Sequence, residues 1–450
     1  MNGSDDLQRL TGALLDMARR AGADQADAVA VRGAALSVDV REGRLEHAER
    51  AEAVDIGLRV LVSGRQASVS ASDHSDRAIA EMAERAVAMA REAPVDDNLG
   101  LADPGQLARD TDSRPLELRD DSPAPTAEDL RDIALRAETA ALSVQGITRI
   151  ESASASASSR MMWLQASNGF SAGYARSGHA ISTIAIGGEG LGMERDWSGE
   201  SRSHRSDLPS PEFIGRQAAE RTLQRLGAKK PPTGSFPILY DQRVSSGLIG
   251  HLLSAVNGSA IARGASWLRN DLGQQVLPAG IDLREDPHLL RMSSSRIFDG
   301  EGLPTAPRLI VGDGVLMGWT LDLATGRKLG MASTANAARG TSAPPSPAVT
   351  NITMTAGTAT PQELIAQMGR GLVVTSMLGA SINANTGDWS RGAAGFWVEN
   401  GEIAWPVNEC TIAGNLRDML MRVTVVSDTP EWRAHAVPSL LVEGMTVAGN

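Results

Sequence analysis

A short apolar stretch, GHLLSAVNG at residues 250–258, contains the side chain with the clearest potential for metal chemistry, His251. It follows the strand-like run FPILYD, and its length and apolar spacing predict a short buried helix. A glutamate and a second histidine on such a helix would complete a hydrolytic zinc site, because zinc needs several protein ligands and its bound water needs a base. Here Leu252 follows His251, and the next histidine is His288. The stretch therefore predicts a helix of the shape that such a zinc site uses, but without the glutamate and the second histidine that the site would need.

The other residues that could bind a metal or attack a substrate are scattered. No two histidines stand at a spacing typical of metal ligands; they are His47, His74, His179, His204, His251, His288 and His435. Because Cys410 is the single cysteine, an internal disulfide is excluded. We expect Cys410 to be a small, buried hydrophobic residue. GGEGLGME at 187–194 departs from the dinucleotide-binding loop, and GASIN at 379–383 lacks the second glycine of a nucleophile elbow. The remaining possibility for metal binding is a site assembled from residues that are distant in the sequence.

Composition narrows the class of protein further. The 450 residues include 43 basic and 54 acidic side chains, a net charge of −11, which disfavours nucleic-acid binding because phosphates require a cationic face. No window approaches the uninterrupted apolar length of a membrane span, and the acidic start MNGSDDLQRL does not resemble a secretory signal. We expect a cytoplasmic protein without a membrane or nucleic-acid partner.

The elements that would position these residues follow one pattern twice in the first 230 residues. Helices are predicted at 5–21 and about 76–92, with Ser75 as cap, and from the caps Thr126 and Ser210. Antiparallel strands are predicted between them: 26–41, 53–62 and 65–72 in the first unit, and 147–157, 159–166, 170–176, 179–187 and 190–199 in the second. An irregular connection, 93–125, separates the units. This predicts an α+β domain, 1–230, of duplicated helix, antiparallel meander and helix.

Residues 231–450 predict a second, β-rich domain. Hairpins are expected at Asp313-Gly314 and Asn400-Gly401, and one helix at about 361–369 begins from the cap Thr360. The segment 333–350, STANAARGTSAPPSPAVT, is small, polar and proline-rich, which predicts a long mobile loop. A barrel-like sheet would hide the edges of so many strands.

Several long stretches resemble the TldE (PmbA) chains of the TldD/TldE metalloprotease family. They are GLIGHLLSAVNGSAIARGASWLRNDLGQQVLPAGIDLREDPHLLRMSSSRIFDGEG, LDLATGRKLGMAST, GDWSRGAAGFWVENGEIAWPVNECTIAGNL and the earlier GMERDW. The resemblance implies a cytoplasmic two-chain peptidase that acts on unfolded or small peptides in peptide maturation and turnover. It also implies that zinc belongs to the TldD-type partner, whose helix carries H-E-x-x-x-H and whose third ligand is a later cysteine.

Placed on this chain, the resemblance puts the first histidine at His251, the glutamate at Leu252 and the second histidine at Val256. The third ligand would fall just beyond IAGN, where the chain reads LRDML, and Cys410 precedes that motif. Leucine cannot take a proton from a bound water, and valine has no lone pair to donate. The resemblance therefore implies no metal and no catalytic residue in this chain, and zinc in its partner.

Two functions stay open at this point. The first is a non-metal TldE-type subunit that contributes cleft and dimer surface, with an extended peptide added to a strand edge near 388–407 or 333–351. The second is a non-enzymatic peptide-binding homodimer, an adaptor of the gyrase-modulator type. A weaker third, a hydrolase using scattered acids, would draw on Asp388, Glu399 and Glu409. The candidate residues for substrate or partner contact are His251, Asn257, Asn336, Asn351, Asp388, Arg391 and Asn415.

Overall fold

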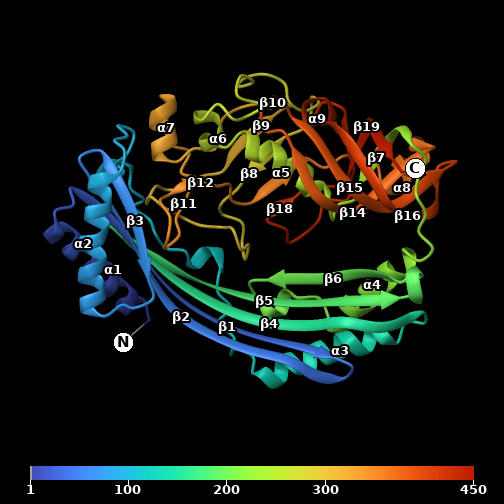
Figure 1. The fold of residues 1–450 in the computed structure, drawn as a ribbon, viewed down its shortest axis with the longest axis horizontal. Helices are drawn as coiled ribbons and strands as arrows, with labels where there is room; N and C mark the ends of the chain where they lie inside the picture. Colours follow the sequence, from blue (N-terminus) through green and yellow to red (C-terminus); the bar gives the residue numbers. More distant parts are fainter. Residues whose placement is uncertain (1–2, 450) are drawn as a thin grey trace.

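One six-stranded antiparallel sheet dominates the first half of the computed structural model, which describes residues 3–449 (Figure 1). Its strand order is β3-β2-β1-β4-β5-β6. The strands are β1 (Gln25–Arg41), β2 (Arg44–Val62), β3 (Arg65–Ala71), β4 (Ile147–Ala166), β5 (Ser171–Gly187) and β6 (Glu194–Arg202). The two predicted units share this sheet through the long β1–β4 pairing.

Four helices cover one face of the sheet. α1 (Gly3–Ala21) and α2 (Asp76–Glu92) pack at one end, and α3 (Ala127–Leu142) and α4 (Pro211–Gln224) pack at the other (Figure 1). The predicted caps Ser75, Thr126 and Ser210 are confirmed, because each side chain accepts a hydrogen bond from the main-chain N–H three residues later. The connection 93–125 contains two short 3₁₀ helices, Pro104–Gln106 and Arg114–Leu116.

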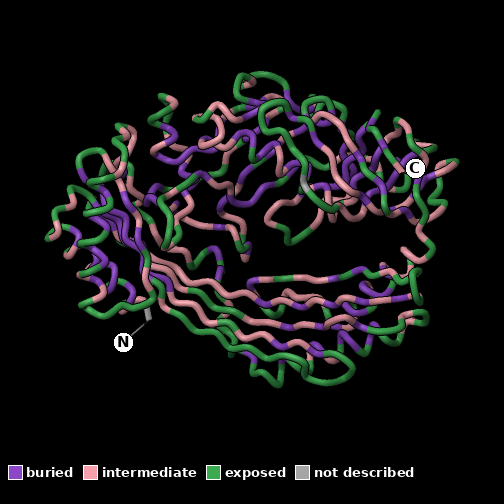
Figure 2. Tube along the Cα trace, viewed as in Figure 1, coloured by how far each residue is buried: buried purple, intermediate pink, exposed green. Residues whose placement is uncertain are grey.

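The strands are longer than the sequence predicts. The predicted pairs 147–157 with 159–166, and 170–176 with 179–187, are each a single strand, β4 and β5, and β2 begins at Arg44 rather than 53. The run SASASASS within β4 has no turn residue, so its pairing with β5 continues through it. The opposite face of these strands is intermediate or exposed over much of its length (Figure 2).

The second half is built around a closed five-stranded barrel, which confirms the barrel-like prediction and the α+β class. Its order is β16-β15-β14-β7-β19, closed by pairing of β16 with β19. The strands are β7 (Gly234–Tyr240), β14 (Gly371–Ile382), β15 (Asp388–Glu399), β16 (Glu402–Asn415) and β19 (Leu440–Ala448), with β17 (Val423–Val425) attached to β19. β7 and β14 are parallel, and the other neighbours are antiparallel.

A second sheet packs beside the barrel, with the order β10-β9-β8-β13-β18. Its strands are β8 (Leu283–Glu285), β9 (Arg308–Gly312), β10 (Val315–Leu316), β13 (Ile352–Met354) and β18 (His435–Ala436). The helices of this half are α5 (Ser245–Ala255), α6 (Gly258–Ala262), α7 (Leu323–Leu329), α8 (Pro361–Met368) and α9 (Leu416–Leu420). The largest apolar core joins α5, the barrel and this sheet. Within residues 3–449, no helix has the length and apolar character needed to cross a membrane.

The segment 333–350 is not the free surface loop that its composition predicts. It forms β11 (Ala337–Ala338) and β12 (Ser346–Pro347) and packs against the N-terminal sheet. Gly57 of β2 permits this approach, since a Cβ there would lie 2.2 Å from the carbonyl oxygen of Thr341. The Arg339 side chain is completely buried. The charged Arg339 side chain can be buried here because it has a partner of opposite charge.

That partner is Asp27 of β1, which accepts hydrogen bonds from both Arg59 of β2 and, at 2.9 Å, Arg339. Burial alone would raise the pKa of Asp27, but the two guanidinium groups outweigh it and hold that pKa below its ordinary value. The ionised carboxylate therefore ties the two halves of the molecule together.

We expect Asp27→Asn to lower the free energy of unfolding by about 3 kcal/mol or more, because two guanidinium groups lose their buried counter-ion. Urea unfolding followed by circular dichroism measures this. Asp16→Asn is the control: its ion pair with Arg19 is exposed, so it should cost less than about 0.5 kcal/mol. Since the pKa of Asp27 is depressed in the folded state, its contribution is present near neutral pH and is lost as pH falls below about 4. An equal loss in the two variants would contradict this role.

Candidate functional site

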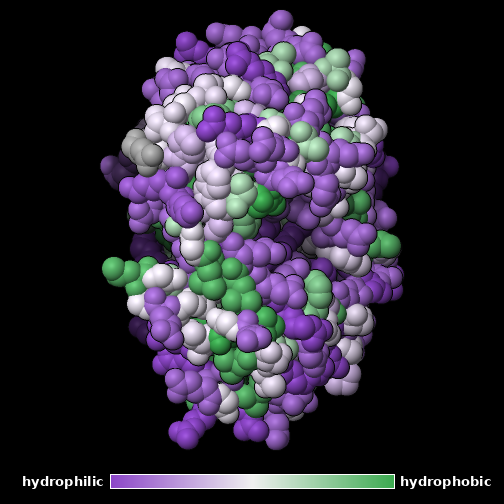
Figure 3. Space-filling view, turned by 90° about the vertical axis from the view of Figure 1, so that its right-hand side faces the viewer, coloured by the Kyte–Doolittle hydropathy of each residue, from purple (hydrophilic) through white to green (hydrophobic). Residues whose placement is uncertain are grey.

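A cleft of about 1600 Å³ lies between the uncovered face of the six-stranded sheet and the outside of the barrel. The sheet contributes β4, β5 and β6, with Ile184, Ile186 and Trp197 among the lining residues. The barrel contributes β14, β15 and β16, with Ser376, Met377 and Leu378. The surface is hollowed between these two walls on the side shown in Figure 3.

The barrel wall presents an unpaired strand edge. β14 has twelve residues, but its parallel neighbour β7 has seven and pairs only with Leu372–Val374. From Thr375 to Ile382, β15 is the only strand that pairs with β14 in the described part of the chain. Four of these residues, 375–378, line the cleft. Their outward main-chain groups can therefore accept a further strand.

The opposite edge, on β6, is occupied by side chains at the same depth. The Thr222 hydroxyl accepts from the main-chain N–H of Asp196, and the carboxylate of Asp196 accepts from that of Trp197. Arg221 donates to the carbonyl oxygen of Trp197 at 3.1 Å. Of the two strands that face each other across the cleft, β14 is the one that is open to an added strand.

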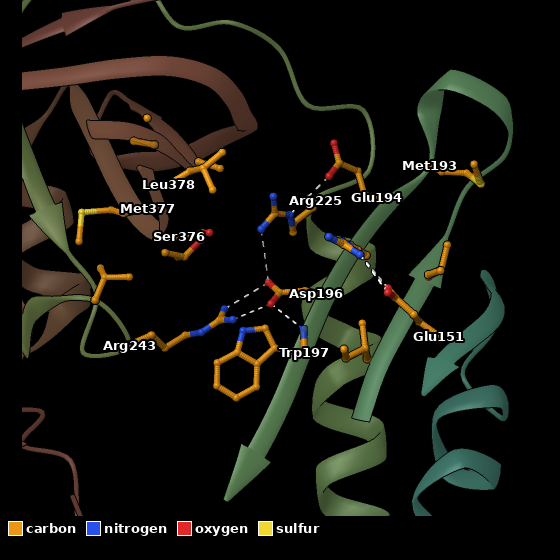
Figure 4. A pocket seen from close by; sticks show the side chains of 18 of the residues that line it. Glu151, Met193, Glu194, Asp196, Trp197, Arg225, Arg243, Ser376, Met377 and Leu378 are labelled. Atoms are coloured by element: carbon orange, nitrogen blue, oxygen red, sulfur yellow. Dashed lines mark hydrogen bonds and ion pairs between the residues drawn. The ribbon is translucent and has the colours of Figure 1, made fainter. Parts of the chain in front are cut away.

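An ion-pair cluster joins the two walls. Arg243, in the turn before α5, donates to Asp196 of β6 at 2.6 Å, and Arg225 lies 3.7 Å from the same carboxylate (Figure 4). Burial would raise the pKa of Asp196, but the hydrogen bond and charge of Arg243 outweigh it, and the pKa lies below its ordinary value. The ionised Asp196 thus fixes the wall that carries α5 against the sheet.

His251 lies on α5 beside the barrel strand β15. Its Nε2 accepts a hydrogen bond from the indole Nε1 of Trp389 at 3.0 Å, and Nη2 of Arg391 lies 3.4 Å from the same nitrogen. A nitrogen that faces two donors must carry the lone pair, so the proton of the neutral ring is on Nδ1. Burial and the Arg391 charge both lower the pKa of His251. The imidazole is therefore neutral, and the lone pair on its Nε2 is already used in the hydrogen bond from Trp389.

These surroundings do not fit a resident metal. Leu252 and Val256, where the resemblance implies the glutamate and second histidine of the metal-bearing chain, are fully buried in the apolar core. A divalent ion at Nε2 of His251 would also meet the Arg391 cation within a few ångströms. Among residues 3–449, no three His, Cys, Asp or Glu side chains lie close enough to share a metal ion. Cys410 is buried against the carbonyl oxygen of Ala393, and burial raises its pKa to about 11.

Two further predicted residues meet at the start of β15. Asp388 accepts hydrogen bonds from Asn415 at 3.0 Å and from Thr386 at 2.7 Å, and both hold its pKa below the ordinary value. The side-chain oxygen of Asn415 also caps α9 by accepting from the N–H of Arg417. The structure thus brings Asp388 and Asn415 together in a turn-fixing arrangement.

The remaining three asparagines hold loops in place. Asn257 caps α6 and donates to the carbonyl oxygen of Pro347. Asn336 donates to the buried Glu285 at 2.7 Å, and Asn351 donates to Ser295 at 2.7 Å. Asn336 and Asn351 are 3% and 1% exposed, so a substrate in the cleft does not reach them in this conformation.

The two strand edges proposed from the sequence differ in their pairing. The first arm of the hairpin 388–407, β15, is paired on both sides, by β14 and β16. Its second arm, β16, pairs with β19 only over residues 411–413, so the outer edge of that arm near residues 402–405 has no partner strand among the described residues. The segment 333–351 is docked against the sheet. Sequence reasoning missed the open part of β14 because GASIN, residues 379–383, was interpreted as a turn, whereas the strand continues to Ile382. The sequence did indicate the sheet side of the cleft: GMERDW, residues 192–197, is one of the stretches that resemble the family, and it contains both Asp196 and Trp197.

Comparison with known proteins gives a consistent result along the whole chain. Three family models match: PmbA/TldA metallopeptidase domain 1 at residues 26–90, the central domain at 120–226 and the C-terminal domain at 233–449. The metalloprotease PmbA of Escherichia coli O157:H7 is 36% identical over 430 residues, covering 95% of this chain and 93% of that protein.

Two solved structures are similar throughout. A Bacteroides thetaiotaomicron protein, named for a supposed role as modulator of DNA gyrase, superposes with a TM-score of 0.90 at 27% identity and covers 99% of both chains. TldE from Thermococcus kodakarensis superposes with a TM-score of 0.82, covering 98% of this chain and 100% of that one. Its 18% identity supports the shared fold alone.

We expect Arg391→Gln to raise the pKa of His251, because the variant removes the neighbouring positive charge, while burial keeps that pKa below its ordinary value. A two-dimensional NMR titration of the imidazole resonances measures the shift. The control, Arg41→Gln, changes an arginine on β1 that lines the cleft and has no contact with His251, and it should leave the titration of His251 unchanged. A titration of His251 that is the same in all three proteins would contradict the contact.

Proposed function

This chain belongs to the PmbA/TldD metallopeptidase family, and from that premise we propose that it is the metal-free, TldE-type subunit of a two-chain peptidase. Its partner is a TldD-type chain that holds zinc, and zinc supplies the activated water that cleaves the peptide bond. This chain contributes the cleft, the strand edge that holds the peptide and the surface that the partner binds. By itself it does not cleave peptides.

The observation that carries the proposal is the environment of His251. Family relatives are named metalloproteases, so the family's chemistry depends on a metal. In this chain the one histidine on the corresponding helix faces the Arg391 guanidinium, and its neighbours Leu252 and Val256 are part of the core. The positively charged Arg391 guanidinium would repel a divalent metal ion bound to His251, so the two cannot share this position. The metal must then come from a different chain.

The substrate that fits the cleft is an extended peptide. Main-chain hydrogen bonds to the open edge of β14, residues 375–382, would hold a strand whatever its sequence, and a folded protein could not present one. Bound peptide lies between β14 and the sheet wall, to which the Asp196–Arg243 ion pair ties the barrel. Selection of unfolded or short peptides follows from this geometry without any specific recognition of sequence.

We expect this chain alone to leave a flexible fluorogenic peptide intact, and the mixture with a TldD-type chain to cleave it. Metal analysis of the separated chains should find zinc in the partner and less than about a tenth of an equivalent here. The control is a mixture with a TldD-type chain in which the glutamate of the H-E-x-x-x-H motif is replaced by glutamine; this mixture should leave the peptide intact. Cleavage by this chain alone after exhaustive chelation would overturn the assignment.

The alternative, a non-enzymatic homodimer that modulates another protein, predicts the reverse outcome. A stable homodimer that ignores the TldD-type chain in size-exclusion chromatography, and a mixture without peptidase activity, would favour it. Both functions use the same cleft, so peptide binding by itself does not distinguish them.

Backbone methylation of the peptide tests the strand-addition geometry. N-methyl groups at every second residue should weaken binding by about five- to tenfold per lost hydrogen bond in one register, and have little effect in the other register. This alternation follows because only every second N–H of an added strand points toward β14. Fluorescence anisotropy with the two methylated series measures it. Equal losses in both series would contradict strand addition.

A further inference from the structure

Large apolar side chains stand exposed on both walls of the cleft. Trp197 of β6 is 51% exposed and Leu378 of β14 is 81% exposed, and both line the same cavity. Ile184, the cross-strand neighbour of Trp197, and Met377 line it as well. Exposed apolar groups on two facing walls of one cavity indicate a binding surface more often than an accident of packing.

The charged side chains of the cleft contribute little to ligand binding. Five arginines and five acidic residues line the cleft, so its walls carry no net charge. Glu151 pairs with Arg195 at 2.9 Å, and Glu194 lies 3.5 Å from Arg225. Because most of these charges already have a partner in the chain, a charged ligand would gain little from them.

The backbone that carries the Trp197 ring is held in position before any ligand arrives. Its main-chain N–H donates to Asp196 and its carbonyl oxygen accepts from Arg221, so both sides of the residue are anchored. The ring lies on the cleft side of β6, next to the Arg243 side chain that Asp196 binds (Figure 4). A surface that is fixed in advance loses little conformational entropy when a ligand covers it.

We propose that Trp197 and Leu378 form a subsite that binds an apolar side chain, aromatic or branched aliphatic, of an extended peptide held on β14. Successive side chains of an added strand alternate in direction, so every second one can face the sheet wall where Trp197 stands. This inference rests on the proposed function and deepens it: the open β14 edge holds any peptide, and the subsite selects among peptides by one side chain.

The test uses a ten-residue host peptide of Gly, Ser and Thr with one guest residue, Ala, Leu, Phe, Asp or Lys. Binding to the full chain is measured by fluorescence anisotropy, alone and with a TldD-type partner. We expect the Leu and Phe guests to bind about tenfold more tightly than Ala, Asp or Lys. Trp197→Ala should bring the Phe-to-Ala affinity ratio close to one and leave the affinity for the Ala guest unchanged.

Two variants serve as matched controls. Trp432→Ala removes another partly exposed tryptophan, and Leu191→Ala removes a fully exposed leucine; neither residue lines the cleft. Both should keep the tenfold preference, and all variants should keep the melting temperature within about 2 °C.

The outcomes separate this inference from the function on which it rests. If all guests bind with equal affinity, or if Trp197→Ala weakens the Ala and Phe guests alike, the subsite is refuted while strand binding stands. A preference for Asp or Lys would refute it as well. If no peptide binds to the chain with or without its partner, the proposed function fails and the subsite fails with it.

Discussion

The main-chain hydrogen bonds of β14 are the constraint on which the candidate site depends. A barrel closes only when every strand has a neighbour on both sides, yet β7 covers just three residues of the twelve in β14. Closure is completed elsewhere, through β16 and β19, so the second half of β14 keeps an open edge without opening the barrel. The fold thereby combines a rigid scaffold with a stretch of cleft-lining backbone that has unused hydrogen-bonding capacity.

Charge pairing then determines what this edge faces. Asp27 with Arg59 and Arg339 at one end of the sheet, and Asp196 with Arg243 at the other, join the two halves at well-separated points. The barrel is therefore held over the uncovered sheet face rather than left to swing. Because these acids are buried or nearly so, their ionised form is kept by specific guanidinium groups, and loss of one partner would leave an uncompensated charge.

The environment of His251 is the feature that supports the proposed metal-free role of this chain within the PmbA/TldD metallopeptidase family. The helix, its glycines and its histidine are present, but leucine and valine fill the core and an arginine occupies the place beside the imidazole. Burying an unneeded glutamate on this helix would be costly, so apolar replacement stabilises the fold. What this chain can still offer is shape, a strand edge and apolar surface.

Local physics was readable from the sequence by itself. Caps at Ser75, Thr126, Ser210 and Thr360, the Asn400-Gly401 hairpin and the α+β class depend on residues close in the chain. Only the tertiary structure decided that two meanders merge into one sheet, that the segment 333–350 docks through Arg339, and that β14 keeps an open edge from Thr375 onward. Pairing partners, cleft walls and buried ion pairs join residues that are 47 positions apart for Asp196 and Arg243 and 312 for Asp27 and Arg339, and no local pattern records which of them meet.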